Sequence, residues 1–547
     1  MKKITLLFLL ILSQAIFAQT KLTETQKLVA TCKVWGYLKY YHPQVAGGKT
    51  DWDKQLFDVL PKIEQANTKE EFSLVLENWI DSLGEVKEIA PIAVPKDIEF
   101  FDKNFDLSWI NSNKLFSTSL SKKLEFIENN RFQGEQHYVT FGRGGNVILK
   151  NENFDKLNYS EKNSRILALF TYWNVIEYFF PDKYLMDQKW DKTLDEMLPA
   201  FIEAKDEEAF YIAFQKLTVK LNDSHAVFYK YGGKQKYIFP FKCKIIDEKM
   251  IVTEITSDEL AKVDDIKIGD VIIKYNDKTI KDFIAENRNL INGSNEASYL
   301  SILMRFGLYG YSDTAKLEFL KEGKTITRTV NRYDYQTVNK NEDKKVKQEE
   351  KFKMLENNIG YVNMGTLEVK DIPVMIEKLN VAKAIVFDIR NYPNGTGQDI
   401  SNFLNSKERK DILFTKPDST YVGRFKWIGP RPCGTENKNN YKGKVVVLVD
   451  GESVSQSEEM TMSFQTADDT TVIGSQTGGA DGNVSRFEII KAFFTQFSGI
   501  GVYYPDKRQT QRIGIIPDIE VKPTILGIQQ GKDEVLDRAL QFIENGK

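Results

Sequence analysis

A run of serines lies at a predicted strand-to-helix junction. Residues 444–449 are apolar and predict a buried strand, and residues 457–465 predict a helix. The polar residues at the junction are Ser453, Ser455, Ser457 and Glu458. A serine at a strand end is held rigidly, and the N–H groups and dipole of the following helix stabilise a developing oxyanion. This pattern favours nucleophilic chemistry, although ordinary helix capping by serine and glutamate explains the same residues and is the simpler local interpretation.

A second polar loop follows another predicted buried strand, residues 384–387. It begins at Asp388 and contains a Pro393-Asn394-Gly395 turn. Such a turn frees backbone N–H groups and lets another chain approach closely, but taken alone it is common. The alternation of strands and helices after residue 350 predicts an α/β domain with a parallel sheet, in which sites lie at the carboxyl ends of strands. Both loops occupy that position.

Histidine is scarce, with only His42, His137 and His225 in 547 residues. His225 lies in the segment Asp223-Ser224-His225 at the end of a predicted helical unit. Its unperturbed pKa lies near neutrality, as a general base requires. The commoner alternative is a structural histidine with satisfied hydrogen bonds. Any function that needs a histidine therefore depends on very few residues.

Two stretches, 27–86 and 165–224, resemble each other at a constant offset of 138 residues. The matched pairs include Trp35/Trp173, Pro43/Pro181 and Trp52/Trp190. This indicates a duplicated helical unit, which we place at residues 20–90 and 161–236. The first copy has Lys87 where the second has His225, so we expect the first copy to be structural and the second to join the chemical site.

Between and after the copies, the pattern changes. Residues 91–160 predict a small β-containing segment, and residues 333–350, rich in Lys, Glu, Asp and Asn, predict a solvated linker. Residues 237–332 contain short apolar strands around Ile268-Gly269-Asp270. This part resembles a PDZ domain, a family that binds extended peptides by strand addition. The alternative is an unrelated β-domain with a Gly-Asp turn.

Taken together, the motifs resemble the C-terminal processing (tail-specific) peptidases, and more closely the tricorn-core branch of that serine peptidase family. The matching segments are the Asp388–Gly395 loop, the Ser453–Glu458 run, Ile473–Gly479 and Gly514–Asp518. The resemblance covers roughly residues 160–540. It implies a multidomain α/β chain with a crotonase/ClpP-like peptidase core at 351–547, an inserted PDZ-like domain and helical N-terminal repeats.

The resemblance also implies roles for individual residues. Ser455 takes the position of the nucleophile, and the N–H groups of Gln456 and of Asn394 or Gly395 would form the oxyanion hole. Bacterial processing peptidases carry a lysine base where this chain has Ala480.

The tricorn-like branch uses a histidine instead, and His225 matches it. That branch also has a glutamate before the late Gly-x-x-Pro-Asp segment, where this sequence has Gln511. We therefore expect Gln511 or Ser224 to orient His225.

Composition excludes several functions. With 75 Lys+Arg against 77 Asp+Glu, the charge of −2 does not favour nucleic acid, and three distant cysteines form neither a disulfide scaffold nor a metal motif. We expect no metal or other cofactor. Residues 1–18 have a basic start and an apolar run, which predicts a signal peptide, hence a periplasmic, cell-envelope or secreted protein, and no other run predicts a membrane span.

The sequence thus predicts an exported serine endopeptidase whose partners are polypeptides, with C-termini captured at the PDZ-like domain. The alternative is a non-catalytic peptide- or ligand-binding envelope protein on the same fold.

Overall fold

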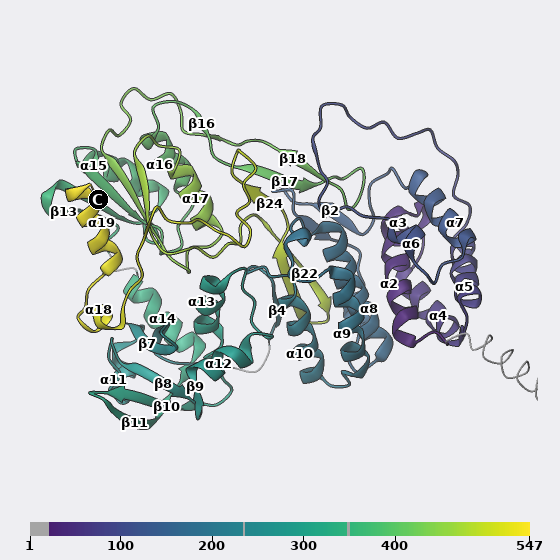
Figure 1. The fold of residues 1–547 in the computed structure, drawn as a ribbon, viewed down its shortest axis with the longest axis horizontal. Coiled ribbons are helices and arrows are strands. Elements are labelled where there is room, and N and C mark those ends of the chain that lie inside the picture. Colours follow the sequence, from purple (N-terminus) through teal and green to yellow (C-terminus); the bar gives the residue numbers. More distant parts are fainter. Residues whose placement is uncertain (1–20, 233–235, 347–349, 547) are drawn as a thin grey trace, which may run out of the picture.

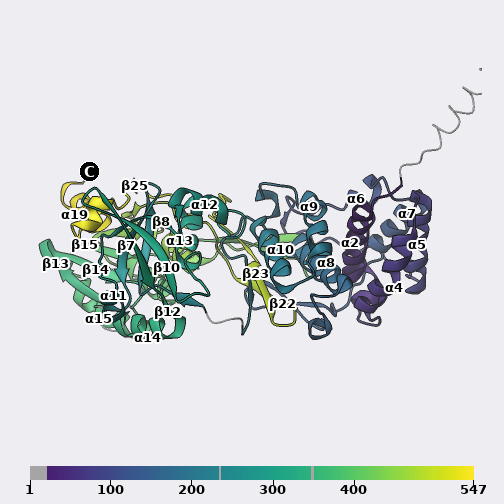
Figure 2. The ribbon, with the colours of Figure 1, turned by 90° about the horizontal axis from the view of Figure 1, so that it is seen from below.

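The computed structural model describes residues 21–232, 236–346 and 350–546. The predicted signal peptide lies outside these residues. The two helical copies occupy one end of an elongated molecule, and the α/β core and the PDZ-like domain occupy the other (Figures 1 and 2). No helix in the described part of the chain is long and apolar enough to cross a membrane.

The two helical stretches have the same layout. The first contains α2 (Glu24–Tyr41), α3 (Pro43–Ala46), α4 (Trp52–Gln65) and α5 (Lys69–Ser82), and the second contains α8 (Lys162–Phe179), η2 (Lys183–Leu185), α9 (Trp190–Glu203) and α10 (Glu207–Val219). The bounds of α2 and α8, and of α4 and α9, differ by the same 138 residues. A stacked indole pair joins the first two long helices of each copy, with ring centroids 6.4 Å apart in both. The sequence repeat is therefore a structural repeat as well.

A basic residue near the start of each copy binds the end of the next long helix. Lys27 Nζ donates to the carbonyls of Glu64 and Ala66, and Arg165 donates to those of Phe201 and Ile202. These contacts satisfy carbonyls that a helix C-terminus leaves free.

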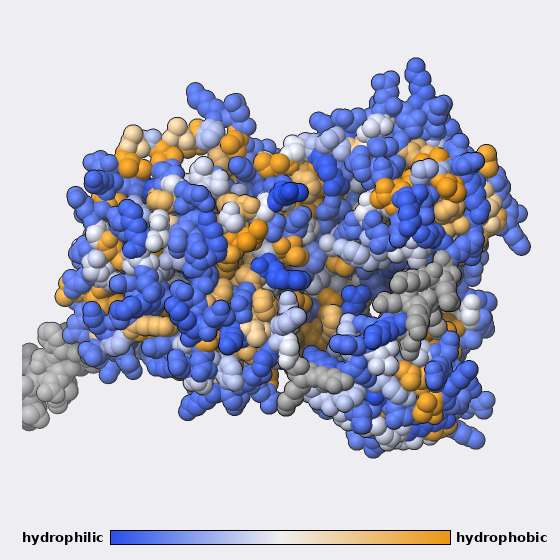
Figure 3. Space-filling model, turned by 180° about the vertical axis from the view of Figure 1, so that it is seen from behind, coloured by the Kyte–Doolittle hydropathy of each residue, from blue (hydrophilic) through white to orange (hydrophobic). Residues whose placement is uncertain are grey.

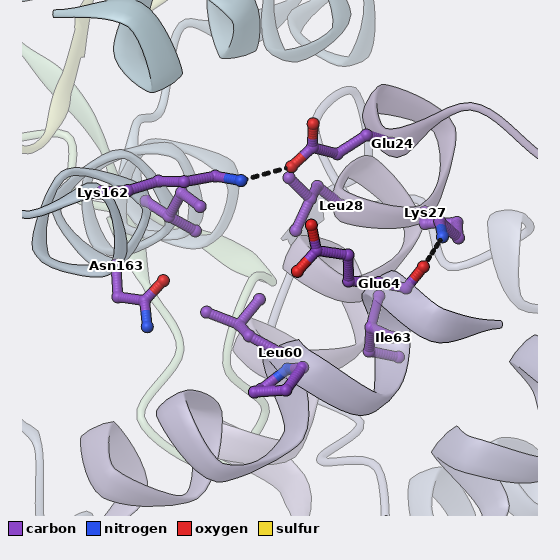
Figure 4. A pocket seen from close by; sticks show the side chains of 10 residues that line it. Glu24, Lys27, Leu28, Leu60, Ile63, Glu64, Lys162 and Asn163 are labelled. Atoms are coloured by element: carbon purple, nitrogen blue, oxygen red, sulfur yellow. Dashed lines mark hydrogen bonds and ion pairs between the residues drawn. The ribbon is translucent and has the colours of Figure 1, made fainter.

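The two copies pack against each other. A small cavity of about 150 Å³ lies between them, and the ion pair Lys162–Glu24, at 2.6 Å, bridges them (Figure 4). Their buried residues belong to one continuous core.

The stretch 91–160 contains β structure, as predicted, and helices as well. It holds the short strands β1 (Phe100–Phe101), β2 (Val139–Phe141) and β3 (Val147–Leu149), but also the helices α6 (Trp109–Ser112), α7 (Thr118–Asn129) and η1 (Phe154–Lys156). Ser117 caps α7 by accepting a hydrogen bond from the N–H of Leu120. Leu120, Leu124 and Ile127 recur at helical spacing and are buried. This helical spacing of apolar residues is present in the sequence, but the prediction for the stretch did not include a helix.

The PDZ-like domain is built on a six-stranded antiparallel sheet: five strands follow in the order β11-β10-β8-β7-β6, and β9 pairs with β8. Its elements are β6 (Phe241–Ile246), β7 (Lys249–Ile255), α11 (Asp258–Val263), β8 (Val271–Tyr275), β9 (Lys278–Thr279), α12 (Ile280–Asn287), α13 (Glu296–Phe306), β10 (Thr314–Lys321) and β11 (Lys324–Asn331). Helix α13 packs on β6, and the core forms from apolar residues of both.

The predicted linker at 333–350 is not an extended segment in its described part. It forms β12 (Tyr333–Asp334), which pairs with β5 (Tyr237–Ile238), and then α14 (Tyr335–Val346). The side chain of Asp334 accepts from the N–H groups of Gln336 and Thr337 and so starts the helix, and Val338 is buried. The charge-rich composition of this stretch therefore predicted a linker where the chain forms a capped helix.

The α/β core is built on a six-stranded sheet in the order β13-β14-β15-β20-β21-β25. The strands are β13 (Phe352–Leu355), β14 (Ile359–Asn363), β15 (Ala384–Asp388), β20 (Lys444–Val449), β21 (Thr470–Gly474) and β25 (Ile519–Glu520). All neighbours are parallel except β13 and β14.

Helices cover both faces of this sheet. The helices η3 (Glu356–Asn358), η4 (Val369–Asp371), α15 (Ile372–Leu379), α16 (Gly397–Leu404), α17 (Gln456–Phe464), α18 (Ile525–Gln529) and α19 (Glu534–Asn545) belong to this part. Residues of α15, α16 and α17 bury one face, and α19 covers the other. The carboxyl ends of β15 and β20 lie side by side, which brings the two predicted loops together.

Two strands of the core reach across to the helical repeat. Strands β22 (Val484–Ile490) and β23 (Phe493–Ser498) form a sheet with β4 (Val227–Lys230), in the order β22-β23-β4. Phe487, Phe493 and Phe497 enter the helical core. Because β4 starts two residues after His225, this pairing fixes the histidine against the C-terminal part of the chain. The remaining strands are β16 (Arg409–Lys410), β17 (Leu413–Pro417), β18 (Phe425–Ile428), β19 (Pro432–Cys433) and β24 (Gly501–Tyr503).

Candidate active site

Ser455 sits at a sharp turn between β20 and α17. It is the N-cap residue of α17, with φ 60° and ψ −120°. This conformation is strained for a residue with a Cβ and is typical of functional turns. Ser453 and Ser457 are fully buried, whereas Ser455 is partly exposed. Of the three serines in the run, Ser455 is therefore the one placed to meet a substrate.

The carboxyl group of Glu458 holds this turn in place by accepting hydrogen bonds from backbone N–H groups. One of its carboxyl oxygens accepts from the N–H of Gly479 at 2.8 Å, and the other accepts from the N–H groups of Ala480 and Ser455, both at 3.1 Å. Burial raises the pKa of Glu458 to about 7, against the lowering effect of these hydrogen bonds. Ala480, where processing peptidases carry a lysine, is fully buried, and its carbonyl accepts a hydrogen bond from the N–H of Ser455 at 2.9 Å.

The imidazole of His225 is held by Ser498. His225 Nδ1 lies 2.9 Å from Ser498 Oγ, and Ser498 Oγ donates to Asp223 Oδ1 at 2.9 Å. Because the one hydroxyl hydrogen of Ser498 is engaged by Asp223, its oxygen accepts from Nδ1, which must carry the proton. Nε2 is then the free, basic nitrogen of the ring.

Asp223 anchors this chain of hydrogen bonds. It is fully buried and also accepts from the N–H groups of Ser498, at 2.7 Å, and His225, at 3.1 Å. Burial lowers the pKa of His225, and the carboxylate of Asp223 works against that lowering. The histidine is thus kept neutral and oriented.

Neither residue expected to orient His225 does so. Gln511 Nε2 donates to Asp223 at 3.2 Å and makes no hydrogen bond with the imidazole. Ser224 Oγ bonds to Ser298 at 2.8 Å and to Ser294 at 3.0 Å, both in the PDZ-like domain. The ring is reached instead by Ser498, because strand β23 pairs with β4 beside it.

Ser498 and Asp223 were not among the residues predicted for the site. Ser498 belongs to no motif and is brought in by strand pairing alone. Asp223 lies two residues before His225, and an acid so close to a histidine was a signal that could have been used.

The predicted oxyanion-hole groups lie together, and one of them, the N–H of Gly395, is already hydrogen-bonded. The side-chain amide of Gln456, oriented so that both its atoms are paired, donates to the Pro393 carbonyl at 2.9 Å and accepts from the N–H of Gly395 at 3.2 Å. Gly395 has φ 72°, a conformation that favours glycine. Asn394 supports the loop through its side chain, which donates to the carbonyls of Gly365 and Leu367.

Gly478 is hydrogen-bonded both to the neighbour of His225 and to a residue of the serine run. Ser224 Oγ donates to the Gly478 carbonyl at 3.3 Å, and the N–H of Gly478 donates to the Ser453 carbonyl at 2.8 Å. In the described residues, no hydrogen bond joins the His225 ring to the Ser455 hydroxyl.

A cavity of about 1260 Å³ opens at this place. Its walls include Ser224 and His225, the elbow residues Gly451 and Val454, and helix α13 of the PDZ-like domain. On the face shown in Figure 3, hydrophobic residues are visible in the middle of the molecule, and further groups lie toward both of its ends. A cavity of this size exceeds the usual range for small-ligand pockets and can take a polypeptide segment.

The PDZ-like domain is tied directly to the elbow. Lys244 Nζ pairs with Asp450 at 2.7 Å, and Asn295 Nδ2 donates to the Thr477 carbonyl at 2.8 Å. The three cysteines are buried and unpaired, and the part of the chain that the structure describes holds no cluster of metal-ligating side chains.

A parallel sheet with a strained serine elbow, beside a histidine and a PDZ-like domain, defines the class of serine-type peptidases. Comparison with known proteins agrees with this class: residues 358–521 match the model of Peptidase family S41, and residues 235–306 match that of the PDZ domain. The chain therefore carries a serine-peptidase domain of family S41 together with a PDZ domain. None of the curated proteins matches the sequence.

The solved structure of mature CPAF shows a similar fold. Mature CPAF complexed with lactacystin is 12% identical and superposes with a TM-score of 0.56 over 70% of this chain and 99% of that chain. The photosystem II D1 C-terminal processing protease is 15% identical, with a TM-score of 0.40 over 68% of this chain and 98% of that chain. The likeness to CPAF confirms the predicted multidomain α/β architecture.

Proposed function

We propose that this protein is an exported serine endopeptidase in which Ser455 attacks the peptide carbonyl and His225 acts as general base. The observation that carries the proposal is the Asp223–Ser498–His225 chain of hydrogen bonds, at 2.9 Å for each link. Asp223 in this chain of hydrogen bonds supplies the carboxylate that is missing at position 511, where the sequence has Gln511. The contact at Nδ1 leaves Nε2 of the imidazole for the reaction.

The proposed reaction follows acyl-enzyme chemistry. Nε2 of His225 takes the proton of the Ser455 hydroxyl as the oxygen attacks, and the oxyanion binds the N–H groups of Gln456 and Gly395. The imidazolium then gives its proton to the leaving amine. Water hydrolyses the acyl-enzyme by the same route, which restores the serine.

Two further parts of the proposal concern the surroundings. Residues 1–18 support export, because they have the composition of a signal peptide. The PDZ domain forms a wall of the cavity that is lined by His225 and by Val454, the residue before Ser455, and this supports capture of polypeptide substrates there.

A second function is a peptide-binding protein without activity. It is favoured by the Gln456 amide, which occupies the N–H of Gly395, and by the absence of a hydrogen bond between His225 and Ser455 in the described residues. Turnover separates the two functions.

The test is hydrolysis of an unstructured protein such as casein by the chain from residue 21 onward. Ser455→Ala and His225→Gln should each abolish cleavage. Ser457→Ala is the matched control, because its hydroxyl is buried without a partner in the same turn, and it should cleave like the wild type. Cleavage that survives in Ser455→Ala, or a folded wild type that cleaves nothing, would contradict the proposal.

A further inference from the structure

Arg486 lies on β22, and β23 separates this strand from β4, which begins two residues after His225. The register of the sheet places Arg486 opposite Gln496, and Gln496 opposite Val227, two residues after His225. Arg486 is exposed and lines the cavity that contains His225. The arginine and the histidine therefore belong to one surface.

Gln496 fixes the position of Arg486 relative to His225. Its Nε2 donates to the His225 carbonyl at 3.0 Å, and its Oε1 accepts from Arg486 Nε at 3.1 Å and Nη2 at 2.8 Å. Strand β23 thus orients the imidazole through Ser498 and the guanidinium through Gln496, two residues earlier on the same face of the strand. The remaining N–H groups of Arg486 are left for another partner.

The charge of Arg486 has no acidic partner among the described residues; its hydrogen bonds go to a neutral amide. The two acids on the same cavity are engaged elsewhere: Glu452 lies 3.6 Å from Lys244, and Asp334 accepts backbone N–H groups of α14. A fixed guanidinium with free N–H groups binds a carboxylate best, because the pair is charge-assisted and bidentate.

We propose that Arg486 forms a subsite for a carboxylate on the leaving-group side of the substrate, which makes acidic polypeptides the preferred class. This inference rests on the proposed function. His225 must protonate the leaving amine, so the leaving segment starts at the histidine. Strands β22 and β4 are two strand spacings apart, about 10 Å, and an extended peptide advances about 3.3 Å per residue. The acidic side chain is thus about three residues beyond the scissile bond.

The test uses internally quenched peptides with amidated C-termini that differ only by Glu or Gln at one of the first four positions after the scissile bond. The wild type should cleave the peptide with Glu near the third position about tenfold more efficiently in kcat/KM than the Gln peptide. Arg486→Gln should reduce this ratio to about one. Arg486→Glu should prefer Lys at that position. Lys491→Gln removes a positive charge from the exposed turn of the same hairpin and should keep the ratio.

A wild-type ratio of one, or a ratio that survives in Arg486→Gln, would overturn the subsite. A peptide that ends at the third position with a free carboxylate separates the two sources of that group: if it is preferred over the internal Glu, Arg486 binds chain ends and the side-chain assignment is wrong. Binding of the Glu and Gln peptides to Ser455→Ala, followed by fluorescence anisotropy, tests the subsite without turnover. If no peptide is cleaved but the Glu peptide binds more tightly, the proposed function fails and the subsite stands.

Discussion

Ser498 Oγ lies 2.9 Å from His225 Nδ1, although 273 residues separate the two in sequence. The contact exists because β23 pairs with β4, which starts two residues after the histidine. Ser498 links the buried Asp223 carboxylate to the imidazole ring through hydrogen bonds. In other serine hydrolases a carboxylate contacts the histidine directly and orients it. Ser498 and Asp223 are thus positioning residues for His225.

Removal of the Ser498 hydroxyl should impair catalysis without impairing substrate binding. In Ser498→Ala, Nδ1 loses its acceptor and the ring loses its fixed tautomer, so we expect kcat to fall about 100-fold with little change in KM. Ser498→Thr keeps a hydroxyl and should recover part of the rate. Equal losses in both variants, or a change confined to KM, would mean that Ser498 has no such role.

The pH dependence of kcat/KM reports on Asp223. His225 must be neutral to act as a base, and burial lowers its pKa, so activity should rise with pH and the midpoint of this rise should lie below the ordinary imidazole value of 6.5. Asp223 raises that pKa, so Asp223→Asn should move the acidic limb to lower pH while lowering the plateau. An acidic limb that moves to higher pH in this variant would contradict the assigned contact.

The Gln456 side chain should slow the enzyme. Its amide occupies the N–H of Gly395, so Gln456→Ala frees this donor while keeping the backbone N–H of residue 456. We expect kcat/KM to increase about fivefold, the worth of one ordinary hydrogen bond. Gln398→Ala, a change in an exposed glutamine of α16, is the control. A decrease in Gln456→Ala would show that the side chain assists the reaction instead.

Glu458 should make stability depend on pH. Its pKa is about 7 in the folded protein and near 4.5 when unfolded, so its stabilising effect is present in full below pH 4.5 and is lost as the pH rises through 7. Glu458→Gln lacks this titration. The free energy of unfolding of the wild type relative to the variant should therefore fall by about 2 kcal/mol between pH 5 and pH 8 in urea titrations. Glu436→Gln, an exposed control, should show no such trend; a constant difference for Glu458→Gln would refute the assignment.

The contact between the helical copies depends on the absence of a side chain at Gly36. A Cβ there would lie 1.8 Å from Asn174 Oδ1, in the buried surface between α2 and α8. Gly36→Ala should therefore destabilise the protein by about 3 kcal/mol. The double variant Gly36→Ala/Asn174→Ala should lose less than the sum of the single changes, as measured by urea unfolding. Strict additivity would show that the two residues do not meet.

The sequence predicts this protein well where information is local. The strand ends at Asp388 and Asp450, the serine run and the repeat offset depend on short-range patterns, and the predicted α/β peptidase core with a PDZ domain is confirmed. Two helices, α7 and α14, were missed because polar residues concealed their periodicity and caps. Ser498 and Gln496 could not be predicted, because only the pairing of β23 with β4 brings them to His225.

The most direct test of the central claim is labelling by a fluorophosphonate, followed by peptide mapping in a mass spectrometer. We expect one phosphonyl group per chain, attached to Ser455, with labelling lost in Ser455→Ala, greatly slowed in His225→Gln and unchanged in Ser457→Ala. A folded wild-type protein that stays unlabelled, or a label attached to another residue, would contradict it.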